Sequence, residues 1–150
     1  LGCAALSGSS YDIDREYLLR ELGFSSLAQN CIDVISSRDF VFRLHSILSL
    51  LMLHVSSLSE EFVIWSTFEF GYVELDDSIA TGSSIMPHKK NPDVFELMRG
   101  KTARVVSNLV QIAMLLESLP TSYNRDLQED KAYLFESLDI VLMTLLVLNE

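Results

Sequence analysis

Three apolar patterns with a step close to 3.6 residues run through the last two thirds of this 150-residue chain. Apolar residues that recur at steps of three and four lie on one face of a helix, and no segment shows the sustained alternation typical of a strand. The second pattern follows Asn91–Pro92 and stops before Pro120, as expected of helix boundaries. We therefore predict an all-α fold with long helices over residues 40–65, 94–119 and 134–148.

Helices of this length are typical of an extended bundle rather than a compact domain. The third pattern is apolar nearly all round between Leu138 and Leu148, which predicts burial on more than one side. The chain cannot cover that surface alone, so we expect it to associate with other helices. Earlier in the chain, a short helix is expected from Asp14–Arg15 to Gly23, and residues 30–38 lead into the first long helix.

The charge of the chain is negative overall but unevenly distributed. An apolar content of 49% excludes a disordered polyelectrolyte, and a net charge of −10 argues against nucleic acid as a partner. Residues 81–104 nevertheless carry five Lys or Arg and two acidic residues, a net charge of +3, which leaves −13 on the remainder. This basic island favours a small anionic ligand. A solvated, basic helix face is the alternative.

The cysteines and the apolar segments bear on the compartment. Cys3 and Cys31 have no metal-type spacing; two buried, reduced thiols are favoured, and a single disulfide remains open. The apolar run Leu138–Leu148 has eleven residues, and no stretch reaches the eighteen or so needed to span a bilayer. The first residue is a leucine, and no secretory signal is seen. We therefore expect this sequence to be part of a longer cytoplasmic protein without membrane partners.

The segment from Thr81 to Asp93, here called the signature loop, reads Thr-Gly-Ser-Ser-Ile-Met-Pro-His-Lys-Lys-Asn-Pro-Asp. Gly82 and Pro87 predict a loop that presents serine hydroxyls beside two lysines. Asn91 is expected to cap the next helix, with Pro92 at its first position and Asp93 near its positive end. Hydroxyls, ammonium groups and a helix N-terminus together favour a carboxylate-bearing substrate.

The signature loop resembles that of the fumarase/aspartase superfamily, whose members cleave C–N or C–O bonds and release fumarate. The resemblance implies that Ser83 is the catalytic base, and that Lys89 and Asn91 bind the carboxylates of the substrate. Lys90 is expected to be peripheral. Glu96 corresponds to a glutamate that supports a catalytic histidine from another segment. Without the resemblance, Asn91 is an N-cap and Glu96 complements the helix dipole.

A second polar segment, here called the polar run, extends from Tyr123 to Lys131 with the sequence Tyr-Asn-Arg-Asp-Leu-Gln-Glu-Asp-Lys. Without any family resemblance, this segment is typical of the start of a helix with mixed surface charge. It closely resembles an element of the argininosuccinate lyases and the related delta-crystallins, as do the segments Ile13–Glu16 and Ser37–Phe40. That resemblance implies that Tyr123, Gln128 and Lys131 contact the substrate. It covers essentially the whole chain.

The resemblance implies the anti-elimination of argininosuccinate to arginine and fumarate, a step of arginine biosynthesis, without a metal or organic cofactor. It further implies that residues 1–150 belong to the central helical-bundle domain of a homotetramer with shared active sites. The chain lacks the N-terminal domain of the family and its histidine motif, so the general acid is expected elsewhere and the isolated segment is expected to be inactive.

Other interpretations remain open. The parent protein could be a non-catalytic structural protein of the delta-crystallin kind, or a sibling lyase acting on adenylosuccinate or aspartate, which the Gln-Glu-Asp-Lys sequence disfavours. The three histidines form no metal-ligand set. His88 departs from the family, which often has glutamine there, and receives no role.

Overall fold

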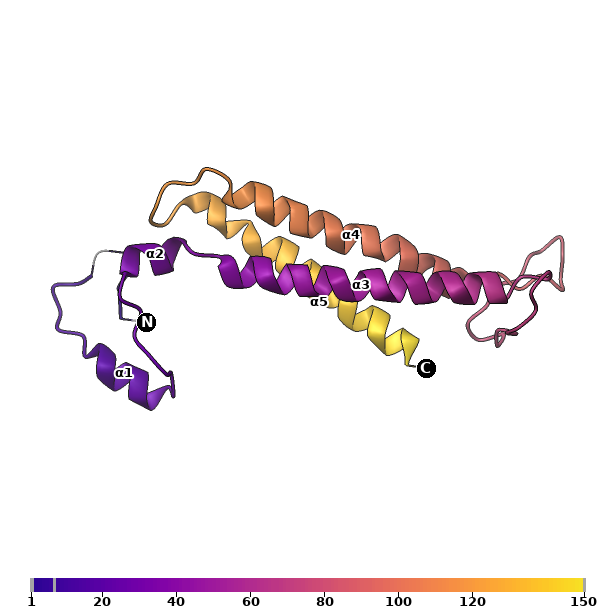
Figure 1. Ribbon diagram of the computed structural model, residues 1–150, viewed down its shortest axis with the longest axis horizontal. Helices are drawn as coiled ribbons and strands as arrows, with labels where there is room; N and C mark the ends of the chain where they lie inside the picture. Colours follow the sequence, from indigo (N-terminus) through magenta and orange to yellow (C-terminus); the bar gives the residue numbers. More distant parts are fainter. Residues whose placement is uncertain (1, 7, 150) are drawn as a thin grey trace.

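A computed structural model describes residues 2–6 and 8–149, and within them all the regular structure is helical. The elements are α1 (Arg15–Glu21), α2 (Cys31–Ser36), α3 (Asp39–Trp65), α4 (Asp93–Leu116), the 3₁₀ helix η1 (Arg125–Gln128) and α5 (Asp130–Leu148). The predicted all-α, long-helix bundle is confirmed. Figure 1 shows α3 and α4 running side by side in opposite directions, with α5 crossing them.

The core lies where the three long helices meet. One apolar cluster joins Leu48 and Met52 of α3 to Val105 of α4 and Val141 of α5. A second lies toward the other end of α3 and includes Val55, Leu75, Phe95 and Met98. Polar contacts tie the same helices: the Thr102 hydroxyl donates to the Met52 carbonyl at 3.1 Å, and Asn108 Nδ2 donates to Ser137 Oγ at 3.0 Å.

The ends of the helices differ from the prediction by one turn or less. Helix α4 ends at Leu116 rather than residue 119, because the backbone at Ser118 turns to a left-handed φ of 59° before Pro120. Helix α5 begins at Asp130, one turn early, so the end of the polar run is helical. Helix α2 was not predicted as a separate element. Its N-cap Asn30 accepts from the backbone N–H groups of Ile32 and Asp33.

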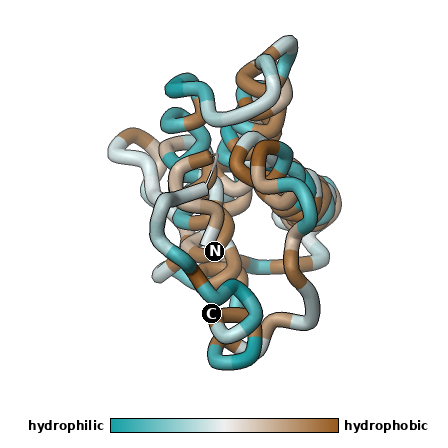
Figure 2. The backbone as a smooth tube through the Cα atoms, turned by 90° about the vertical axis from the view of Figure 1, so that its left-hand side faces the viewer, coloured by the Kyte–Doolittle hydropathy of each residue, from teal (hydrophilic) through white to brown (hydrophobic). Residues whose placement is uncertain are grey.

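Many apolar side chains remain exposed on the single chain. Figure 2 shows that hydrophobic residues occur along all parts of the backbone. On α5, for example, the side chains of Phe135, Leu142 and Met143 are each more than half exposed. Helix α3 is also long and apolar enough to cross a membrane, by length and composition alone, so the expectation that no segment reaches that length was wrong. A core helix of a bundle passes the same test, and α3 packs along α4.

A disulfide joins Cys3 to Cys31, with 5.7 Å between the two Cα atoms. The favoured interpretation of two reduced thiols is therefore wrong, and the alternative that remained open describes this structure. The bond connects the first described residues to the first residue of α2. Helix α1 buries no residue, and the contacts of this segment include the disulfide and a hydrogen bond from Arg15 Nη2 to the Ala28 carbonyl (2.9 Å).

Candidate active site

The signature loop leaves and re-enters the bundle at the end where α3 stops and α4 starts (Figure 1). A short antiparallel bridge closes its base: Asn91 N donates to the Thr81 carbonyl at 2.9 Å, and Thr81 N donates to the Asn91 carbonyl at 3.3 Å. The Thr81 hydroxyl also bonds the Asp93 carboxylate. The two ends of the signature loop are therefore held together by these hydrogen bonds.

The predicted N-cap at Asn91 is wrong. Helix α4 starts at Asp93 after Pro92, with no side-chain cap. Asn91 instead takes part in the bridge, and its Nδ2 donates to the Thr81 carbonyl at 3.1 Å. A pairing partner ten residues earlier thus replaces the capping bond expected from local sequence. The side-chain oxygen of Asn91 forms no hydrogen bond with the described residues, so it can accept one from a ligand.

Ser83 lies in the first limb of the loop and is half-buried. Its Oγ accepts hydrogen bonds from the backbone N–H groups of Ile85 at 3.3 Å and Met86 at 3.4 Å. Donors of this kind favour a negatively charged oxygen, which a serine acting as a base requires. The described residues show no hydrogen bond between Ser83 and an ammonium group, so only part of the predicted environment is assembled.

The two lysines of the loop have different surroundings. Lys90 Nζ lies 2.9 Å from Asp77 Oδ1 and 3.1 Å from Glu74 Oε1. Hydrogen bonds from Lys90 to Asp77 and Glu74 raise its pKa. Lys89 is exposed and forms no ion pair with any residue that the structure describes. A ligand carboxylate at the loop therefore meets the charge of Lys89 rather than that of Lys90.

The basic residues between positions 81 and 104 likewise differ in whether they have an acidic partner. Arg99 pairs with Glu60, and Arg104 pairs with Glu136 at 2.5 Å, which leaves Lys89 and Lys101 without ion pairs among residues 2–6 and 8–149. Lys101 lies two turns into α4, away from the loop. Lys89 is thus the lysine of the signature loop that has no acidic partner among the described residues, while the carboxylates of Asp93 and Glu96 lie in the first turn of α4.

Glu96 lies in the first turn of α4 and is exposed. Within the described part of the chain its carboxylate makes no hydrogen bond or ion pair. Because its predicted partner is a histidine expected from another segment, the role of Glu96 stays a prediction. None of the described residues forms a cluster of histidine, cysteine or carboxylate ligands that could hold a metal ion.

The polar run lies at the opposite end of the bundle, between α4 and α5. Tyr123 is 45% exposed, and Gln128 ends η1 with an exposed side chain. Asn124 Nδ2 donates to the Pro120 carbonyl at 2.9 Å and the Ser122 carbonyl at 3.3 Å, which stabilises the turn before η1. Tyr123 and Gln128 are therefore free to meet a ligand.

Lys131 forms an ion pair with Asp130, a contact that the sequence does not predict. Its Nζ lies 2.7 Å from Asp130 Oδ1, and Asp130 Oδ2 accepts from Arg38 Nε at 2.5 Å. Asp130 is only 4% exposed. Burial alone raises the pKa of Asp130, but the hydrogen bonds from Lys131 and Arg38 outweigh burial and hold the pKa below its usual value. Two separate motifs, Ser37–Phe40 and the polar run, thus meet at one buried carboxylate.

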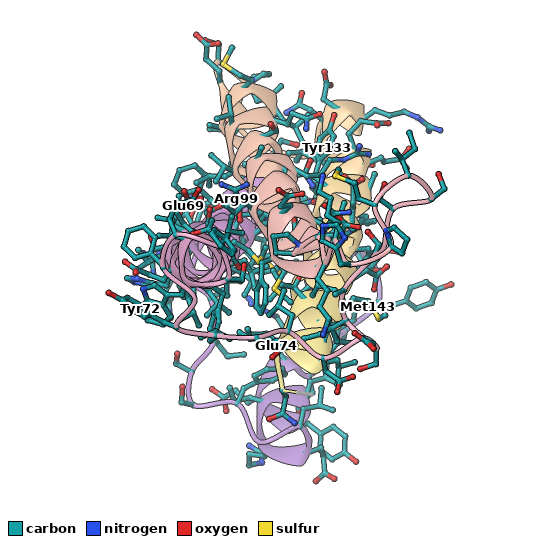
Figure 3. The ribbon with its side chains drawn as sticks, turned by 90° about the vertical axis from the view of Figure 1, so that its right-hand side faces the viewer. Glu69, Tyr72, Glu74, Arg99, Tyr133 and Met143 are labelled. Atoms are coloured by element: carbon teal, nitrogen blue, oxygen red, sulfur yellow. A yellow bond between two sulfur atoms is a disulfide. The ribbon has the colours of Figure 1, made fainter. Side chains whose placement is uncertain are left out.

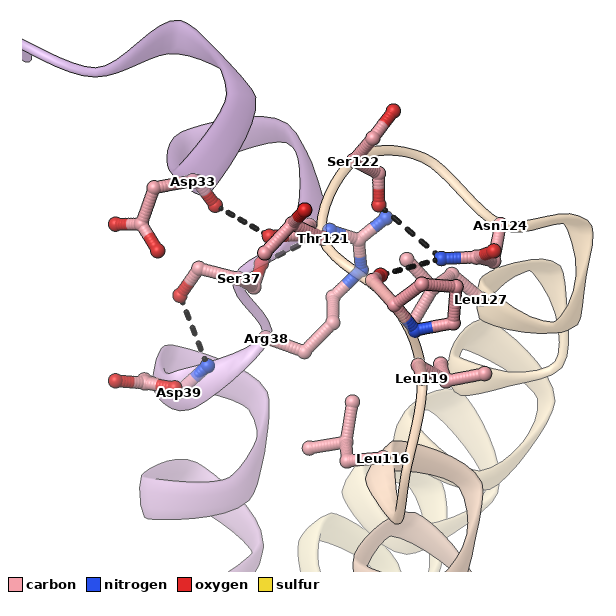
Figure 4. Close-up of a pocket in the computed structure, with 12 residues that line it drawn as sticks. Asp33, Ser37, Arg38, Asp39, Leu116, Leu119, Thr121, Ser122, Asn124 and Leu127 are labelled. Carbon is pink, nitrogen blue, oxygen red and sulfur yellow. Dashed lines mark hydrogen bonds between the residues drawn. The ribbon is translucent and has the colours of Figure 1, made fainter.

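A cavity of about 270 Å³ opens beside this contact (Figure 4). Its walls come from the α2–α3 junction and from the segment that follows α4. They carry hydroxyl, amide, guanidinium and carboxylate groups beside apolar residues, from Asp33, Ser36, Ser37, Arg38, Asp39, Leu116, Leu119, Pro120, Thr121, Ser122, Asn124 and Leu127. The cavity gives this end of the bundle a polar recess next to Tyr123, one of the predicted substrate contacts.

The two halves of the predicted site do not meet within one chain. Helix α4 separates them, and its 24 residues rise by roughly 36 Å at 1.5 Å per residue. Ser83, Lys89, Asn91 and Glu96 lie before or at the start of that helix, whereas the polar run follows its end. A substrate no larger than an amino-acid adduct cannot bridge such a distance. A site that uses both halves therefore requires more than one copy of the chain.

Comparison with known proteins gives consistent matches. A protein-family model described as "Lyase" matches residues 1–107. Argininosuccinate lyase from Caldicellulosiruptor bescii is 51% identical over 150 residues, which are 100% of this chain and 32% of that protein. Argininosuccinate lyase from Acetivibrio thermocellus is 50% identical over 150 residues, again 100% of this chain and 33% of the relative. The chain thus spans about a third of the length of these relatives.

A solved structure agrees with the sequence matches. The crystal structure of EDDS lyase in complex with formate superposes with a TM-score of 0.76 at 30% identity, covering 94% of this chain and 29% of that one. A variant of EDDS lyase with bound fumarate gives a TM-score of 0.75 at 29% identity, with the same coverage of both chains. Both matches cover nearly the whole chain, so the fold and the sequence indicate the same group of proteins, the lyases.

Proposed function

The chain belongs to the lyase family of the fumarase/aspartase superfamily, and from this premise we propose that its parent protein is an argininosuccinate lyase. The reaction is the elimination of argininosuccinate to arginine and fumarate, within arginine biosynthesis. One observation carries the proposal: relatives named argininosuccinate lyase are about 50% identical along the full chain, both halves of the predicted site included.

In this proposal the signature loop performs proton abstraction. Ser83 takes the Cβ proton next to a carboxylate, and the N–H groups of Ile85 and Met86 favour the charged serine oxygen. Lys89 stabilises the dianionic carboxylate that develops, since its ammonium forms no ion pair in the described structure. Asn91 binds the same part of the substrate. The guanidino group leaves with a proton from an acid outside this chain, and Glu96 supports the histidine involved.

The polar run binds the rest of the substrate. Tyr123 and Gln128 present exposed polar groups, and Lys131 presents its ammonium beside Asp130. Because Asp130 is also bonded to Arg38, its charge is shared between two cations, and Lys131 keeps part of its attraction for a substrate carboxylate.

Assembly follows from the distance between the halves. We propose that residues 1–150 form part of the central domain of a cytoplasmic homotetramer, in which the loop of one copy meets the polar run of another. The exposed apolar faces of α3 and α5 supply surface for such packing. The substrate is the small molecule argininosuccinate, and the reaction uses the residues of the protein without a cofactor.

The experiment that tests the proposal is an assay of fumarate release, followed by ultraviolet absorbance, with the full-length protein and argininosuccinate. Release of fumarate from argininosuccinate, and not from adenylosuccinate or aspartate, is expected. A folded, tetrameric protein without turnover would instead indicate the structural alternative of the delta-crystallin kind. Turnover of adenylosuccinate or aspartate would indicate a sibling lyase.

A further inference from the structure

The segment 74–77, here called the acidic arm, lies against the second limb of the signature loop. Three oxygen atoms of the arm surround Lys90 Nζ: Asp77 Oδ1 at 2.9 Å, Glu74 Oε1 at 3.1 Å and the Leu75 carbonyl at 3.1 Å. We propose that Glu74 and Asp77 are positioning residues that act through Lys90 to hold the limb carrying Lys89 and Asn91. The effect on turnover rests on the proposed function; the effect on the loop does not.

The arm itself is fixed to the bundle. Leu75 is 6% exposed and packs in the apolar cluster with Val55, Phe95 and Met98, so the carbonyl that accepts from Lys90 belongs to a buried residue. The next residue, Asp76, accepts a hydrogen bond from Ser78 N at 2.9 Å, which stabilises the turn that follows. Figure 3 shows Glu74 at this end of the bundle. Lys90 is therefore linked, through the Leu75 carbonyl, to a segment that packs in the core.

Lys90 stands between the two residues predicted to bind carboxylates. The bridge between Thr81 and Asn91 fixes the base of the loop, and the three contacts of Lys90 add a second attachment one residue away. These contacts direct Lys90 at the arm, whereas Lys89 is exposed and forms no ion pair with any described residue. Asn91 Nδ2 is held by the Thr81 carbonyl at 3.1 Å, and its side-chain oxygen accepts no hydrogen bond from the described residues.

The acidic arm also determines which of the two lysines of the signature loop can bind a substrate carboxylate. Asp77 and Glu74 pair with the Lys90 ammonium, and their hydrogen bonds raise its pKa. Lys90 therefore does not compete with Lys89 for a substrate carboxylate. The side chains of the pair are exposed, 37% for Lys90 and 86% for Glu74, so the contacts should contribute little to global stability. Their role is local geometry, which distinguishes the proposal from a structural salt bridge.

The test measures hydrogen exchange of the backbone amides of residues 82–90 in the full-length protein. The variants are Glu74→Gln with Asp77→Asn, Lys90→Met, and the combination of all three. We expect exchange about two- to tenfold faster in the first two, and no faster in the combination than in Lys90→Met, because loss of the Lys90 ammonium already removes every contact with the arm. Lys90→Arg, which keeps the charge, and Glu69→Gln, an exposed carboxylate on the same end of the bundle without an ion pair in the described residues, should match the parent protein.

Turnover supplies the second measurement. In the same variants kcat should fall about two- to tenfold with little change of thermal stability, and Lys90→Arg should retain most of it. Unchanged exchange, or additive effects in the combined variant, would overturn the positioning role. Faster exchange with unchanged kcat would overturn its link to the reaction. A parent protein that releases no fumarate would count against the proposed function, while the exchange data would still decide the role of the arm.

Discussion

Replacement of Asp130 by asparagine tests the buried contact that joins two distant motifs. The substitution keeps the size of the side chain and removes its charge. In the structure the Asp130 carboxylate is 4% exposed and accepts from Arg38 Nε at 2.5 Å and from Lys131 Nζ at 2.7 Å. Its loss leaves the guanidinium of Arg38, whose side chain is only 16% exposed, without a counter-ion. We expect the full-length protein to be destabilised.

The magnitude follows from the exposure of the two partners. A hydrogen bond to a charged group contributes about 1.5–3 kcal/mol. The Arg38 contact is largely buried and should keep most of that value, whereas Lys131 is 59% exposed and water screens its contact. The expected loss is about 2–3 kcal/mol, below the 3–5 kcal/mol typical of breaking a fully buried pair. Asp139→Asn is the matched control, because Asp139 is exposed on the same helix and has no ion pair among the described residues.

The pH dependence identifies the charge as the cause. The pKa of Asp130 is lower in the folded protein than its unfolded value of about 3.9, so its contribution to stability is present above that pH and is lost as the pH falls through the folded pKa. Denaturant or thermal unfolding of parent and Asp130→Asn should therefore differ fully at neutral pH and converge below about pH 4. A difference that is the same at every pH, or no larger than that of Asp139→Asn, would refute this reasoning.

Three further predictions concern the site and the bundle. Ser83→Ala in the full-length protein should lower kcat by about 10²–10⁴-fold, with substrate affinity within about tenfold; retention of more than roughly a tenth of the parent rate would exclude Ser83 as the base. Lys131→Met and Gln128→Ala should raise KM by roughly ten- to a hundredfold, since a charge-assisted contact is worth about 1.5–3 kcal/mol; steady-state kinetics that show a lower kcat at constant KM would place them in the chemistry. The isolated 150-residue segment should self-associate through its exposed apolar faces and release no fumarate. Light scattering that shows a stable monomer, or fumarate production by the segment, would contradict this.

The long helices could be predicted because their apolar periodicity is a property of local sequence. Each spans five turns or more, enough for the pattern to stand out against chance. Helix α2 has six residues, too few for a periodic pattern to emerge. The predicted N-cap at Asn91 is wrong for a different reason. Capping is predicted from adjacent residues, whereas the bridge between Asn91 and Thr81 depends on how the loop closes.

Contacts between distant segments were the least predictable part of the site. Arg38 and Asp130 lie 92 residues apart, and nothing in either motif alone indicates that they meet. The clamp on Lys90 by Glu74 and Asp77 and the disulfide between Cys3 and Cys31 are of the same kind. For the charged residues the sequence allows many pairings, and for the two cysteines it does not indicate whether they form a bond.

The separation of the two site halves could have been deduced from the sequence. One predicted helix connects the signature loop to the polar run, and a helix of known length fixes the distance between its ends. The resemblance to a family with shared active sites pointed to the same conclusion. What the structure adds is which end of the bundle carries each half, and that the polar run has a cavity beside it.

In the proposed oligomer, an active site combines the signature loop of one copy with the polar run of another. Its most direct test is to co-express full-length Ser83→Ala with full-length Gln128→Ala/Lys131→Met and to measure fumarate release from argininosuccinate at low substrate concentration. Each variant alone should have little activity. Randomly mixed oligomers should recover roughly a quarter of the parent activity, because a quarter of their sites combine two intact halves. A mixture no more active than the separate variants would show that both halves act within one chain and would contradict the account.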